Sequence, residues 1–299
     1  MAGVDRTAAE ALFAEAVAPQ VVQAATESSR ALQSINTIPM GTATTRVPVL
    51  AALPTGGFLA ADQDVKPQSA VSWDKKMLTA EEVAVIIPIS ESAIADATTD
   101  IVGDVTRLIG QEFGRILDAA VFFGTGAPAT FPTGGLNGIA ETASQEIEAT
   151  GVPATDMNAL LSILEGLGFD PTDVAAGRTY KSALRGQTGT GGVPIYLPGD
   201  GAQVTASIYG VPLVYPLGWN AAEADAITWD DAGVVIGVRQ DVTIKILEEA
   251  TLTGFGNLAE KDSIAVRAVM RVAFQVANPV TIHAGQRRYP VARLTPKAP

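Results

Sequence analysis

The chain has 299 residues, of which 47% are hydrophobic and 17% charged, whereas a typical soluble protein has about 25% charged residues. Lys and Arg number 20 against 32 Asp and Glu, and the net charge of −12 excludes a surface that attracts nucleic acid over its whole extent. The absence of cysteine excludes disulfides, thiolate metal sites and cysteine nucleophiles. The low charge indicates surface buried against other subunits, with the Ala- and Gly-rich usage of a high-GC genome as the alternative cause.

Membrane insertion is not expected. The longest apolar runs, residues 83–89 and 234–238, are far shorter than the ~20 residues that span a bilayer. The first residues also lack the basic start and apolar stretch of a signal peptide. We therefore expect a soluble protein that stays where it is made.

The first 80 residues are predicted to be largely extended. Residues 1–45 begin Ala-rich and then become a Thr- and Ser-rich string, which is typical of an arm. Short strands are predicted at residues 47–50 and 71–73, and the loop residues between them indicate a long two-stranded excursion. Because two strands alone are marginally stable in water, this excursion needs a partner surface. A strand at residues 82–89 then returns to the body.

Two helices are predicted next, over residues 101–123 and 156–167. The apolar residues of the first helix follow the three-and-four spacing of one buried face. They are Val105, Leu108, Ile109, Phe113, Ile116, Leu117 and Ala120. The opposite face carries Arg107, Gln111, Arg115 and Asp118, which we expect to face solvent.

The remaining chain is predicted to be mostly β. Strand patterns cover residues 206–214, 234–238, 242–247 and 264–276. Residues 266–299 carry six basic residues and no acidic one. The fold class is therefore predicted to be α+β, with a basic C-terminal end.

Three passages carry a resemblance to a known family. The first is V-A-V-I-I-P-I-S-E-S at 83–92, then the long helix, F-G-T-G at 123–126 and P-T-G-G-L at 132–136. The second is S-I-Y-G-V-P-L-V at 207–214. The third is V-I-G-V-R-Q-D-V-T-I at 235–244 with D-S-I-A-V-R-A at 262–268. From about residue 46 onward, the chain resembles the tailed-phage major capsid proteins with the Hong Kong 97-like fold.

The resemblance implies a division of the chain and a structural role. The implied parts are an N-terminal arm (1–45), an extended loop (46–80), a peripheral domain (81–139, with a spine helix at about 100–123), an axial domain (140–261), and a C-terminal strand that returns to the peripheral domain and ends in a basic tail (262–299). The implied function is self-assembly, through hexamers and pentamers, into an icosahedral virion capsid that encloses double-stranded DNA and is assembled in the host cytoplasm. Portal, scaffolding and decoration proteins are further partners, although a 45-residue arm is too short for a built-in scaffold.

Candidate contact residues follow from this resemblance. In the extended loop they are Lys66, Trp73 and Asp74, and in the basic tail they are Arg287, Arg288 and Arg293. Trp73 is expected to anchor the loop on a neighbour, with an ordinary core tryptophan as the alternative. The basic tail is expected to pair with acidic neighbouring subunits, and a weak contact with packaged DNA is the alternative.

Several motifs that can mark chemistry have simpler explanations in this chain. The glycine-rich segments at 124–126 and 188–192 lack the Lys-Ser or Lys-Thr of a phosphate loop. His283 is the single histidine, which excludes a multi-histidine metal site. The acidic pairs Asp62/Asp64, Asp230/Asp231 and Glu248/Glu249 are expected to be solvated loop charges rather than acid–base or calcium sites. We expect no catalytic, cofactor-binding or metal-binding residue.

Two alternative functions remain open. An encapsulin-type nanocompartment shares the implied fold but encloses protein cargo. A carboxylate-dependent hydrolase would need acids that converge in a pocket. Covalent Lys-to-Asn links join subunits in some family members, but the pattern around Lys66 and Asn278 does not support carrying that chemistry over.

Overall fold

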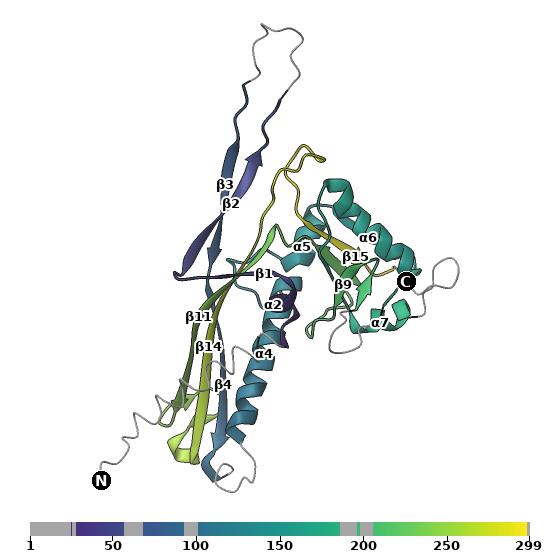
Figure 1. Cartoon of the computed structure of the whole chain (residues 1–299). Helices are drawn as coiled ribbons and strands as arrows, with labels where there is room; N and C mark the ends of the chain where they lie inside the picture. The colour runs from purple at the N-terminus through teal and green to yellow at the C-terminus, as the bar shows by residue number, and fades with distance from the viewer. Residues whose placement is uncertain are drawn as a thin grey trace, which may run out of the picture.

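The computed structural model describes residues 25, 28–56, 68–92, 101–185, 196–197 and 206–297. These residues form two sheets with helices packed on them, and a narrow two-stranded hairpin extends from one end (Figure 1). The predicted α+β class is confirmed. Among the described residues, no helix is both long enough and apolar enough to cross a bilayer.

A four-stranded sheet built from long strands forms one half of the molecule. Its order is β1 (Asn36–Pro39), β11 (Val234–Leu247), β14 (Ser263–Val276) and β4 (Glu81–Ser90). β14 pairs antiparallel with both neighbours, whereas β1 pairs parallel with β11. The sequence predicted β11 as two strands, and its pairing with β14 does shift register between Arg239 and Thr243.

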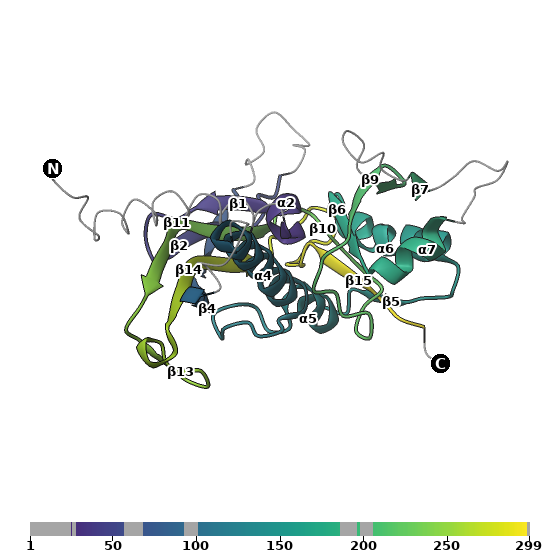
Figure 2. The same ribbon diagram turned by 90° about the horizontal axis from the view of Figure 1, so that it is seen from below.

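The long helix α4 (Ile101–Phe123) runs along this sheet (Figures 1 and 2). Its 23 residues extend about 35 Å at 1.5 Å per residue. Ile109, Phe113 and Leu117 on its buried face share one hydrophobic core with residues of the sheet such as Val266 and Met270. The predicted helix is confirmed, and so is most of its apolar face; the prediction is wrong for Leu108, whose side chain is 52% exposed.

A seven-stranded sheet forms the other half. In spatial order it comprises β5 (Glu146–Glu148), β15 (Val291–Thr295), β10 (Ala226–Trp229), β6 (Asp173–Ala176), β9 (Val211–Val214), β8 (Ser207–Ile208) and β7 (Tyr196–Leu197). Helices α6 (Pro153–Leu167) and α7 (Arg178–Arg185) pack on one face of this sheet, where Val174 and Ala176 of β6 lie. Ala175 of the same strand points to the opposite face and belongs to the core that contains α4.

The two halves meet at the C-terminal end of α4. Phe122 lies 5.7 Å from Trp229 of β10, measured between ring centroids. Just beyond, Gly124 has a φ of 65° and its backbone approaches Gly134, where a Cβ on Gly124 would lie 2.7 Å from the Gly134 Cα. Only glycine fits both requirements. The two glycine motifs thus allow α5 (Gly135–Thr142) to dock against α4.

Shorter elements complete the fold. They are α2 (Arg30–Ser34), the hairpin strands β2 (Thr44–Ala52) and β3 (Ser72–Thr79), the pair β12 (Thr251–Leu252) and β13 (Gly256–Asn257), and the 3-10 turn η1 (Ala259–Lys261). β11 falls in the segment that the resemblance assigns to the axial domain, and it pairs within the four-stranded sheet. β15 falls in the expected basic tail and is an inner strand of the seven-stranded sheet.

Candidate functional site

The β2–β3 hairpin carries exposed apolar side chains. It is antiparallel, with Leu50 opposite Trp73 and Arg46 opposite Met77, and it extends away from both sheets (Figure 1). The side chain of Trp73 is 67% exposed and that of Met77 is 44% exposed. The alternative that Trp73 is a core tryptophan is therefore wrong for the single chain. Isolated two-stranded ribbons with such side chains are stabilised by a partner surface.

The base of the hairpin is held by a small hydrophobic cluster, which we call the foot. It consists of Met40, Leu78, Val235 and Ala273. The foot depends on Gly237 of β11, where an added Cβ would lie 2.8 Å from Leu78 Cδ2 and would also collide with Met40 Sδ. This glycine belongs to the V-I-G-V-R motif of the sequence, so the motif has a packing explanation.

An ion pair braces the hairpin against the segment that precedes β15. Arg287 Nη1 lies 2.9 Å from Asp74 Oδ2, and the Val280 amide donates to the Leu50 carbonyl at 3.2 Å. The hydrogen bond from the Lys75 amide, followed by that from Arg287, lowers the pKa of Asp74. Two residues predicted for different contacts, Asp74 in the loop and Arg287 in the tail, are thus partners within one chain. This pairing could not be predicted, because Asp74 and Arg287 are 213 positions apart in sequence.

The other predicted contact residues have different outcomes. Arg293 is only 8% exposed, and its guanidinium lies 3.2 Å from Glu141 and donates to Glu146 at 2.7 Å. Arg293 was predicted to contact a neighbouring subunit or DNA from a basic tail, but it is paired within its own chain because β15 is an inner strand. Arg288 is half-buried and its amide donates to Pro279. Lys66 lies outside the described residues.

A buried carboxylate fastens the N-terminal segment to α4. Asp118 is fully buried and accepts hydrogen bonds from Ser29 Oγ at 2.8 Å, the Ala31 amide at 3.0 Å and the Arg30 amide at 3.2 Å. Burial raises the pKa of Asp118, and these hydrogen bonds oppose the rise. The prediction that Asp118 faces solvent is wrong, because α2 covers that part of the helix. One helical turn away, an added Cβ on Gly114 would lie 2.8 Å from the Ser29 amide.

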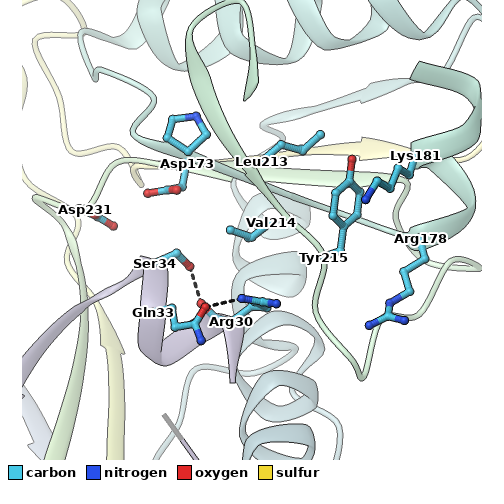
Figure 3. Close-up of a pocket in the computed structure, with 11 residues that line it drawn as sticks. Arg30, Gln33, Ser34, Asp173, Arg178, Lys181, Leu213, Val214, Tyr215 and Asp231 are labelled. Atoms are coloured by element: carbon cyan, nitrogen blue, oxygen red, sulfur yellow. Dashed lines mark hydrogen bonds between the residues drawn. The ribbon is translucent and has the colours of Figure 1, made fainter. Parts of the chain in front are cut away.

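Two adjoining pockets lie between α2, α4 and α7. The larger, about 840 Å³, is lined by Arg30, Asp173, Lys181 and Asp231 among others, and Figure 3 shows these side chains. The smaller, about 460 Å³, shares Arg30 with it. Burial and, secondarily, the charge of Asp231 raise the pKa of Asp173 to about 7.

Of the predicted acidic pairs, Asp230/Asp231 stabilises a turn. Asp230 accepts the Ala232 amide at 2.8 Å, and Asp231 accepts from the Trp229 indole at 2.9 Å, so both serve the turn after β10. Glu248 and Glu249 follow the end of β11, and Asp62/Asp64 lie outside the described residues. Within the described ranges, no group of three or more His, Asp or Glu side chains has the arrangement of a metal site.

Comparison with known proteins agrees with this architecture. A sequence profile of the phage capsid family matches residues 10–286. A chain of Microbacterium phage Oxtober96 is 40% identical with a TM-score of 0.76, covering 90% of this chain and 91% of that one. A chain of Mycobacterium phage Adephagia is 32% identical with a TM-score of 0.78, covering 91% of each. The capsid of a native GTA particle, 15% identical with a TM-score of 0.61 over 92% of this chain and 90% of that one, is similar in fold alone. No curated protein sequence matches.

The fold and the exposed hairpin are those of a structural protein that associates with its own copies, and the chain belongs to the phage capsid family. Within this family it is a major capsid protein. Its location is the virion capsid, where it self-associates into capsomers. The family match favours the phage capsid over the encapsulin-type alternative.

Proposed function

We propose that this subunit has a Hong Kong 97-like fold and builds a closed icosahedral shell of hexamers and pentamers around double-stranded DNA. The order of elements supports the proposal: a two-stranded hairpin, a long strand, a long helix, a second sheet and a returning strand follow one another along the chain. The match over most of the chain to the phage capsid family supports it as well.

The proposed division of labour follows the two sheets. Residues 1–45 act as the arm and residues 46–80 as the loop that overlaps a neighbouring subunit. The four-stranded sheet and α4 form the peripheral domain, and the seven-stranded sheet with α6 and α7 forms the axial domain. Portal, scaffolding and decoration proteins are proposed as further partners, and the host cytoplasm as the place of assembly.

The exposed face of the hairpin carries the proposal. Val71, Trp73 and Met77 are 46%, 67% and 44% exposed, and all three lie on or next to one strand. Because the foot fixes the base of the hairpin and the Asp74–Arg287 ion pair holds it farther along its strands, a neighbour meets these side chains in a defined orientation. Large aromatic side chains dominate the energy of protein interfaces, so Trp73 is proposed as the anchor.

Assembly of purified subunits tests the proposal. Replacing Trp73 with alanine is expected to raise the concentration needed for shell formation at least about tenfold, equivalent to ~1.4 kcal/mol per contact. The melting temperature of the unassembled subunit should stay unchanged, because the side chain is exposed. Leu108→Ala, which truncates a 52% exposed apolar side chain on α4, is the matched control. Negative-stain microscopy and sedimentation measure the outcome, and a W73A variant that assembles like the parent contradicts the hairpin contact.

A further inference from the structure

Four cationic side chains from three helices line the two adjoining pockets. Arg30 of α2 and Arg178 of α7 line both pockets, Lys181 of α7 lines the larger one, and Arg107 of α4 lines the smaller one. We call this set, Arg30, Arg107, Arg178 and Lys181, the basic groove. In Figure 3, Arg178 and Lys181 lie at the end of the larger pocket opposite to Asp173 and Asp231. The two acids therefore leave the cationic end positively charged.

The basic groove differs from other cations of the chain in what it pairs with. Arg115, Arg271, Arg287 and Arg293 each form an ion pair with a carboxylate. In the part of the chain that the structure describes, none of the four groove cations does so. Arg30 donates to Gln33 at 2.5 Å, and the Lys181 ammonium lies 4.9 Å above the Tyr215 ring. In a chain with net charge −12, this leaves a local cationic surface that the described residues do not neutralise through ion pairs.

The shape of the cationic surface indicates an extended anion. Along α7, Arg178, Lys181 and Arg185 follow a spacing of three and four residues, while Tyr180 and Leu184 on the other side are buried. The positive face therefore continues beyond the pockets. A single carboxylate side chain would engage only one or two of these groups, whereas a chain of phosphates can engage all of them.

We propose that the basic groove binds the phosphate backbone of the enclosed double-stranded DNA, an inference that rests on the proposed function of the shell. Arginine and lysine are the main phosphate ligands, and glutamine and tyrosine side chains add further hydrogen bonds. Gln33, Gln111 and Tyr215 also line the two pockets. Backbone contacts carry no sequence information, so binding is independent of DNA sequence. The predicted tail residues Arg287 and Arg293 are already paired, and the groove takes over the DNA contact that was considered for them.

Binding of a fluorescent 20-base-pair duplex to the purified full-length subunit tests the groove. The test variant is R107Q/R178Q/K181Q, and Arg30 is left in place because its side chain donates to Gln33 within α2. The matched control, K245Q/K261Q/R271Q, removes the same charge from the four-stranded sheet and its connecting turn. Each phosphate contact contributes about −0.9 to the slope of log K against log salt, so the test variant should lose about 2.7 of that slope. We expect at least a tenfold loss of affinity at low salt for the test variant only.

The groove proposal is rejected if both variants lose affinity equally, if neither variant loses affinity, or if the wild-type subunit fails to bind the duplex at low salt. A competition experiment gives a further test, in which polyglutamate and unlabelled duplex each displace the fluorescent duplex. If polyglutamate does so at a lower concentration of negative charge than the unlabelled duplex, the DNA proposal is rejected and the occupant is an acidic segment of a neighbouring subunit. Negative-stain microscopy of the same preparations keeps the two proposals separate. If the wild-type chain forms no shells, the proposed function fails, whereas normal shells of the test variant with reduced nucleic-acid content support the groove.

Discussion

Removing the Asp118 carboxylate should release the N-terminal segment from α4. In Asp118→Ala, the Ala31 and Arg30 amides and the Ser29 hydroxyl all lose their acceptor. Each buried donor left unsatisfied costs about 1–3 kcal/mol, and Ser29 can rotate to another partner. The desolvation that raises the pKa of Asp118 offsets part of this loss. We therefore expect the free energy of unfolding to fall by about 3 kcal/mol.

Asp118→Asn should cost less. The asparagine retains the oxygen equivalent to Oδ1, which accepts from both Ser29 and Ala31. Its amide group replaces Oδ2 and then faces the Arg30 amide, so two donors meet. The expected loss is about 1 kcal/mol. Glu112→Ala, which removes an exposed ion pair with Arg115 on the same helix, is the control and should change stability by less than about 0.5 kcal/mol.

Urea denaturation of the unassembled subunit measures these changes, and hydrogen exchange locates them. The Ile35 amide, which donates to Ala31, and the β1 amides paired with β11 should exchange faster in Asp118→Ala, while the centre of β14 stays protected. If Asp118→Ala unfolds at the same urea concentration as the parent and β1 keeps its protection, then the carboxylate does not fasten the segment and the reasoning is refuted.

Two further predictions concern the same region and the larger pocket. Gly114→Ala should destabilise the subunit by about 1–3 kcal/mol, because the new methyl group overlaps the backbone at Ser29. The control is Gly166→Ala on α6, which has nothing within 4 Å of the new methyl group and should be neutral or slightly stabilising. Thermal melts of both variants measure the difference. The pKa of Asp173 is raised to about 7, so the stability that it contributes is present below the ordinary value of 3.8 and is lost as pH rises through about 7. Asp173→Asn cannot ionise, so melting temperatures between about pH 4 and 8 should decline less with pH than those of the parent, and parallel profiles would contradict the raised pKa.

Periodic segments could be predicted from the sequence, and contacts between distant segments could not. The spacing of apolar residues indicated α4 and β14, and the loop composition indicated the β2–β3 hairpin, because burial of one face leaves a repeating pattern. Short elements such as α7 and β10 were missed, since four to eight residues hold too little of a period. The function could still be predicted, because the three passages that resemble the phage capsid family do not depend on these short elements.

The candidate site shows the same division. Exposure of Trp73 agrees with the anchor that was predicted, although its contact with a neighbour stays a prediction. Asp118 looked like one more polar residue on a charged helix face, because its partner Ser29 lies 89 positions away in sequence. Arg293 looked like part of a basic tail, because nothing local shows that β15 inserts between β5 and β10. Long-range pairing decides the role of both residues.

Met40 connects the N-terminal segment to the base of the hairpin. From Ser29 to Ala31, the N-terminal segment is hydrogen-bonded to Asp118. It then continues through β1 to Met40, which packs against Leu78 of the hairpin. One continuous strap therefore ties the long helix, the edge of the four-stranded sheet and the base of the hairpin together. A shift of this strap moves the base of the hairpin, so the neighbour contact that we propose for Trp73 depends on whether the N-terminal segment is seated on α4.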